Sequence, residues 1–199
     1  MRISRSYSVD DWKALRFASE TDWDSAITMF LDRIETRYLE HIRVLLPRST
    51  SGFAVLSLES ALIETLEQFR RGKSKTPKYQ GQQYFESFLT QTAFGEYFDV
   101  PLAGLFYKTI RCGLLHQAEA DGTSRIKRGG ELPLVSYTVD HEGIVVNTRK
   151  FHELLEKVIE DYVAELRKPD SQDLRHLFRR KMNYICRIEQ QEAEEGGIA

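Results

Sequence analysis

The fold is decided by the stretch FYKTIRCGLLHQ, which covers residues 106–117. From Leu102 to Leu115, apolar side chains recur at three- and four-residue steps, a spacing that predicts a helix buried inside a helical bundle. Asp99 and Pro101 suit the first turn of this helix, because an acid there complements the helix dipole and proline needs no hydrogen-bond partner. Asp121-Gly122 is expected to close it.

Arg111 and His116 lie near the C-terminal end of this otherwise apolar helix. Five residues of separation place the two side chains about 140° apart at about 100° per residue. A long arginine side chain can reach back along its helix, and Gly113 between the two residues would leave a gap for a phosphate-sized group. We therefore expect both side chains to meet one ligand at the end of the helix.

The pattern of an arginine, four residues and a histidine, inside an apolar helix that follows amphipathic helices, resembles the HEPN family. These are small helical domains that include many RNA-cleaving toxins and defence nucleases. None of the other four histidines has an arginine five to seven positions before it. The resemblance implies RNA as substrate, a homodimer with two Arg/His pairs facing a shared cleft, and a possible antitoxin or nucleotidyltransferase partner.

The chemistry that suits Arg111 and His116 is the transesterification of RNA. A neutral imidazole can take the proton from a ribose 2′-OH, and a guanidinium can neutralise the charge that grows on the phosphate. Because the 2′-OH is the nucleophile, we expect neither a metal nor a cofactor. The prediction is a metal-independent endoribonuclease with Arg111 and His116 as catalytic residues.

Two other interpretations stay open. Many HEPN-like domains do not cleave RNA and act as binding modules, and this chain has Cys112 where the family often has asparagine after the arginine. In a purely structural interpretation, Arg111 pairs with Glu59 or Glu64, and His116 caps the carbonyls at the end of its helix.

Further residues are candidates for supporting roles. The residues that could support the catalytic pair are Glu59, Glu64, Lys108 and Gln117. Two basic loops could contact the RNA backbone, one on each side of the central helix in sequence. Their candidate RNA-binding residues are Lys73 and Lys75 in the first loop and Arg125, Lys127 and Arg128 in the second.

The composition predicts one ordinary globular domain. The chain has 199 residues, of which 41% are hydrophobic and 29% charged, and its net charge of -2 favours no general attraction to nucleic acid. Cys112 and Cys186 both lie in apolar patterns, which is typical of reduced thiols in a cytoplasmic protein. No apolar run approaches the roughly 20 residues that span a membrane, and no cluster of metal ligands is visible.

The rest of the chain predicts a mainly all-α fold, an up-and-down helical bundle with flanking helices and one small β-hairpin. A brief lid helix is expected near 8–17, and the bundle core covers about 22–168 of a single domain spanning 1–199. We expect helices at 22–46, 53–71, 82–94 and 147–168, a hairpin at 132–146, a basic helix at about 170–190 and a frayed acidic tail at 191–199. The basic helix would face RNA, a partner or solvent.

Overall fold

The computed structural model describes residues 1–188, and the expected acidic tail at 191–199 lies outside them. As predicted, the fold is mainly helical with a small β element. The α-helices are α1 (Val9–Lys13), α2 (Glu20–Ile34), α3 (Glu40–Leu45), α4 (Gly52–Arg70), α5 (Gly81–Gln91), α6 (Val100–Leu105), α7 (Gly113–Gln117), α8 (Thr148–Leu166) and α9 (Gln172–Cys186). The strands are β1 (Arg125–Lys127), β2 (Val135–Tyr137) and β3 (Ile144–Asn147).

Three shorter segments, η1 to η3, connect some of these helices. The π-helical segment η1 (Glu35–Leu39) joins α2 to α3, and a second π-helical segment, η3 (Phe106–Cys112), joins α6 to α7. The expected helix at 82–94 ends at Gln91, and a 3₁₀ turn, η2 (Ala93–Glu96), follows it. Because η3 joins α6 to α7 directly, the expected central helix is one continuous helical run made of these three segments.

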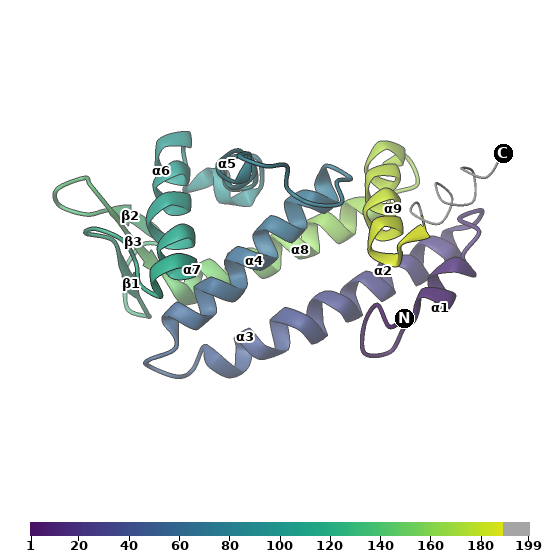
Figure 1. The fold of residues 1–199 in the computed structure, drawn as a ribbon, viewed down its shortest axis with the longest axis horizontal. Helices are drawn as coiled ribbons and strands as arrows, with labels where there is room; N and C mark the ends of the chain where they lie inside the picture. Colours follow the sequence, from purple (N-terminus) through teal and green to yellow (C-terminus); the bar gives the residue numbers. More distant parts are fainter. Residues whose placement is uncertain (189–199) are drawn as a thin grey trace.

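The long helices run along the long axis of the molecule (Figure 1). The run α2–η1–α3, together with α4 and α8, forms this long part, while α6 to α7 and the sheet stand at one end and α9 crosses the other. Buried apolar side chains form one core cluster that draws on all these elements. Within it, the rings of Phe106 and Phe151 stack with their centroids 5.2 Å apart, which ties the central helix to α8.

Local sequence signals set most helix ends. Ser8 and Asp11 form a capping box at the start of α1. The side chain of Asn147 accepts a hydrogen bond from the backbone of Lys150 and caps α8. Gly72 follows α4 with a φ of 58°, a left-handed conformation that glycine adopts without steric cost.

The β element contains the predicted hairpin and one additional strand. β2 and β3 pair in antiparallel fashion within the expected 132–146 segment. β1 pairs with β3 in parallel, with Arg125 opposite Val145, and forms the other edge of the sheet. The sequence predicted a loop at residues 125–127, because three residues carry too little alternation to indicate a strand. The partner strand supplies the backbone hydrogen bonds that make it one.

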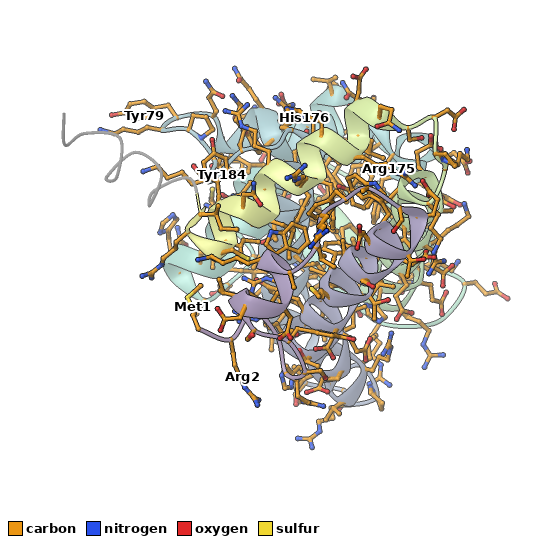
Figure 2. All side chains as sticks on the ribbon, turned by 90° about the vertical axis from the view of Figure 1, so that its right-hand side faces the viewer. Met1, Arg2, Tyr79, Arg175, His176 and Tyr184 are labelled. Carbon is orange, nitrogen blue, oxygen red and sulfur yellow. The ribbon has the colours of Figure 1, made fainter. Side chains whose placement is uncertain are left out.

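Figure 2 views the end opposite the sheet, where α9 crosses in front and carries Arg175, His176 and Tyr184. Not all of its basic residues are exposed. Arg175 is buried and pairs with Glu20 of α2 through two hydrogen bonds of 2.9 and 2.6 Å. Lys181 is also buried, and burial lowers its pKa to about 8. Part of the positive charge of this helix therefore holds the fold together.

Candidate functional site

The central helix begins as predicted but ends earlier. The side chain of Asp99 accepts a hydrogen bond of 2.8 Å from the backbone of Leu102, and Pro101 occupies the first turn. The helix ends at Gln117, because Ala118 adopts a left-handed conformation with a φ of 56°. The expectation that Asp121-Gly122 closes the helix was wrong: those residues belong to the loop that leads to β1.

Arg111 lies at the end of the π-helical segment η3 and points toward α4. Its Nη2 donates a hydrogen bond of 3.0 Å to Glu64, and its guanidinium lies 5.4 Å from the centre of the Tyr107 ring. Its side chain is only 20% exposed. Burial lowers the pKa of Arg111, but the hydrogen bond and charge of Glu64 outweigh burial and raise it overall. Arg111 is therefore a charged side chain held in one place.

His116 has the opposite environment. It lies in the last turn of α7 and is exposed, and within residues 1–188 no hydrogen bond or ion pair to it is found. Its imidazole is accessible to a ligand or to another protein. The neighbouring Leu115 is 53% exposed, so an apolar side chain accompanies the histidine at this surface.

Gly113 does not leave the gap that was expected between these residues. It is buried, and a Cβ built on it would lie 2.5 Å from the backbone oxygen of Glu119 and 2.9 Å from the backbone nitrogen of Asp121. The loop after α7 folds back over the glycine, and the backbone nitrogen of Asp121 donates a hydrogen bond of 2.8 Å to Thr109. The space predicted for a phosphate is filled by the chain itself.

The two candidate glutamates have separate partners. Glu64 pairs with Arg111, whereas Glu59 lies 3.0 Å from Nδ1 of His152 on α8. Both members of this second pair are buried, and burial raises the pKa of Glu59 to about 7 although the hydrogen bond and charge of His152 act against it. Glu59 thus joins α4 to α8 and makes its contact with His152, not with Arg111.

The other two candidates for support, Lys108 and Gln117, are both exposed. No hydrogen bond or ion pair of either side chain is found within residues 1–188. They lie on the same helical run as the candidate catalytic pair and contribute polar groups to its surface, but the fold does not direct them to Arg111 or His116.

The two basic loops lie at opposite ends of α4. Lys73 and Lys75 follow the last turn of this 19-residue helix, while β1 packs near its first turns. A 19-residue helix is about 28 Å long. All the candidate RNA-binding side chains are exposed: Arg125, Lys127, Arg128, Lys73 and Lys75. The two loops are therefore separate surfaces and do not form one site.

The second basic loop borders a cavity of about 550 Å³, which we call the basic cavity. It lies between the α3–α4 loop, β1 and the first turn of α8. Side chains from all three segments line it, among them Thr50, Phe53, Ile126, Lys127, Arg128 and Arg149. Thr50, Phe53 and Arg149 were not among the site residues predicted from the sequence. A signal was available, because residues 48–53, 125–130 and 149–150 contain several cations and no acid.

Figure 1 shows that α7, the sheet and the start of α4 lie at the same end of the molecule. The loop between α7 and β1 connects them directly, since Ser124 donates a hydrogen bond of 2.7 Å to Thr109 of the central helix. His116 and the basic cavity thus belong to one end of the fold, and Lys73 and Lys75 to the other.

Comparison with protein-family models, curated proteins and solved structures finds no match. Within residues 1–188, no helix is both long and apolar enough to cross a membrane. In the same part of the chain, no three histidine, cysteine, aspartate or glutamate side chains gather as a metal site would require.

Proposed function

We propose that this protein is a metal-independent endoribonuclease in which His116 transfers protons and Arg111 holds the phosphate. The observation that carries the proposal is the contrast between these two residues on one helical run. Arg111 is held by Glu64 and Tyr107 on a π-helical segment, and His116 is exposed five residues later. Single π-turns within helices often occur at functional sites.

In the proposed reaction the ribose 2′-oxygen attacks the adjacent phosphorus. His116 as a neutral imidazole takes the 2′-OH proton, the 2′-O–P bond forms, and the P–O5′ bond breaks. A protonated imidazole gives a proton to the departing 5′-oxygen, so the products are a 2′,3′-cyclic phosphate and a 5′-hydroxyl. The guanidinium of Arg111 stabilises the negative charge of the transition state.

Within residues 1–188 no contact joins Arg111 to His116: the arginine pairs with Glu64, and the loop after α7 covers Gly113 between the two residues. A second copy related by a two-fold axis would supply another Arg111 and His116. One histidine could then act as base and the other as acid. The exposed Leu115 beside His116 would be covered in such a contact. We therefore propose a homodimer in which two copies contact each other at the end of α7. We place it in the cytoplasm.

A second candidate function is favoured by the pairing of Arg111 with Glu64. A carboxylate 3.0 Å from the guanidinium already neutralises much of the charge that a phosphate clamp needs. Together with Cys112 next to Arg111, this supports a non-cleaving RNA-binding or protein-interaction module, with an antitoxin or a nucleotidyltransferase as partner.

The deciding experiment incubates the pure protein with end-labelled RNA in the presence of a chelator. His116→Ala should lower the cleavage rate by about 10²- to 10⁴-fold. Arg111→Lys should also lower it, because lysine cannot form the bidentate contact of a guanidinium. His41→Ala is the matched control, since His41 is an exposed histidine on α3.

Three results would contradict the nuclease proposal. The wild-type protein could leave RNA intact in chelator, or folded His116→Ala could cleave as fast as wild type. In the third, Arg111→Lys lowers the melting temperature without changing the cleavage rate, as a purely structural arginine would. A monomer at micromolar concentration in light scattering would count against the dimeric site.

A further inference from the structure

The basic cavity has an unusual balance of charge. Three of its side chains are cationic, Lys127, Arg128 and Arg149, and among the described residues 1–188 no carboxylate lines it. Within residues 1–188, none of these three side chains takes part in a hydrogen bond or an ion pair. The whole chain has a net charge of -2, so the local excess opposes the global balance. Like charges that share a cavity without a counter-ion repel one another, and an anion would relieve that repulsion.

The fold brings Arg149 next to the adjacent cations Lys127 and Arg128, and it places the start of α4 beside them. A Cβ built on Gly52 would lie 2.9 Å from Cγ2 of Ile126, so the start of α4 closely approaches β1. The hydroxyl of Thr148 donates to the backbone oxygen of Lys127 at 3.3 Å, which joins the start of α8 to the same strand. Packing therefore fixes the backbone from which the three cations extend.

Neutral donors are present at the same place. The hydroxyl of Ser51 donates to Leu45 and Arg48 and does not cap α4, so the first backbone N–H groups of this helix have no side-chain cap. Ser49 and Thr50 line the cavity with further hydroxyls. Uncapped N–H groups at a helix start add to the attraction that the three cations exert on an anion.

An aromatic ring completes the cavity. Phe53 lines it, is 42% exposed and lies outside the core cluster of buried apolar side chains. Exposed aromatic rings next to cations are typical of proteins that stack the bases of a single strand while cations hold its phosphates. A duplex hides the faces of its bases, so this arrangement favours a single strand.

We propose that the basic cavity binds one nucleotide of single-stranded RNA, with a phosphate among Lys127, Arg128 and Arg149 and its base on Phe53. The choice of RNA rests on the proposed ribonuclease function, whereas the phosphate and stacking contacts rest on the cavity itself. The volume of about 550 Å³ lies within the range of about 300–1,000 Å³ that small ligands occupy in proteins. The cavity would then hold the strand at the end of the molecule that carries His116.

The test measures the binding of a fluorescent single-stranded oligonucleotide by anisotropy. All its riboses are 2′-O-methylated, so it cannot be cleaved by 2′-oxygen attack and binding is separated from catalysis. The variant Lys127→Ala/Arg128→Ala should bind about tenfold or more weakly. The slope of log affinity against log salt should become shallower by about 0.7 for each phosphate contact removed.

Three further variants test the stacking of the base and the specificity of the charge effect. Phe53→Ala should weaken binding by about fivefold or more, and Phe53→Tyr, which keeps a ring, should bind like wild type. The matched control is Arg179→Ala/Arg180→Ala, which removes two exposed cations from α9 at the other end of the molecule. This control should leave the affinity within about twofold of wild type.

Several outcomes would overturn the proposal. Wild type could fail to bind the strand, or the cavity variant and the α9 control could lose affinity equally. Phe53→Ala could keep the affinity of wild type, or wild type could bind double-stranded RNA as tightly as the single strand. Competition by inorganic phosphate or a free nucleoside monophosphate at matched nucleotide concentration would assign the cavity to a free anion instead. Binding of the methylated strand without cleavage of unmodified RNA would contradict only the nuclease proposal. If the protein cleaves RNA but the cavity variant binds the strand as tightly as wild type, only the proposal for the basic cavity is contradicted.

Discussion

The buried pair of Glu59 and His152 makes a sharp prediction about pH-dependent stability. In the native protein, Oε1 of Glu59 lies 3.0 Å from Nδ1 of His152, and both side chains are buried between α4 and α8. Replacing His152→Leu removes the hydrogen bond and the charge that lower the pKa of Glu59, and it leaves the burial that raises it. The pKa of Glu59 in the folded variant should therefore be at least as high as in wild type, where it is about 7.

The sign and size of the effect follow from proton binding. Between the unfolded pKa of 4.5 and a folded pKa of about 7, the folded variant keeps a proton on Glu59 that the unfolded chain has lost. Stability therefore falls as pH rises through this window, by about 1.4 kcal/mol per unit. Between about pH 5 and about pH 7 the free energy of unfolding should fall by about 2–3 kcal/mol.

The assay is urea denaturation followed by circular dichroism at several pH values in that range. The double variant Glu59→Gln/His152→Leu is the matched control, because an amide replaces the titrating carboxyl at the same position. The difference in stability between the single and the double variant isolates the titration of Glu59 from that of all other groups. If the two variants show parallel pH profiles, Glu59 is not held protonated by burial, and the reasoning is wrong.

Two further predictions concern the stability of the fold, and a melting temperature measures each of them. Gly113→Ala should destabilise the fold by about 1–3 kcal/mol, because its Cβ would lie 2.5 Å from the backbone oxygen of Glu119. Gly104→Ala on the same helical run is the control and should be close to neutral, because its Cβ would lie 3.2 Å from the end of the flexible Glu86 side chain. Equal drops in melting temperature for the two variants would refute this difference. Arg175→Met should cost about 2 kcal/mol, because the buried guanidinium donates a hydrogen bond of 2.8 Å to the carbonyl of Leu166 and two more to Glu20. An unchanged melting temperature would show that these bonds together contribute nothing.

Local sequence was enough to predict the helical class and several of the helix ends. Asp99 and Asn147 are caps because a short acceptor side chain satisfies N–H groups that the helix itself leaves free. Gly72 ends α4 because glycine adopts a positive φ at no steric cost. The apolar periodicity along 102–115 predicted a buried central helix, and Phe106 and Ile110 are fully buried. All these signals act within a few residues of chain.

Contacts between distant residues decided the rest of the fold. β1 is a strand because β3, whose paired residues lie 20 positions later in sequence, pairs with it. The central helix ends at Gln117 because the following loop packs back on Gly113. Neither the pairing nor the packing has a local signal, because each depends on where another part of the chain lies.

The candidate site divides in the same way. The sequence by itself singled out Arg111 and His116, and it left open whether Glu59 or Glu64 pairs with the arginine. The two glutamates are five residues apart on α4, so their side chains point about 140° apart. Only the packing of α4 between the central helix and α8 decided that Glu64 faces Arg111 and Glu59 faces His152. The basic cavity has the same origin, because three segments that are far apart in sequence each contribute part of its lining, and only tertiary packing brings them together.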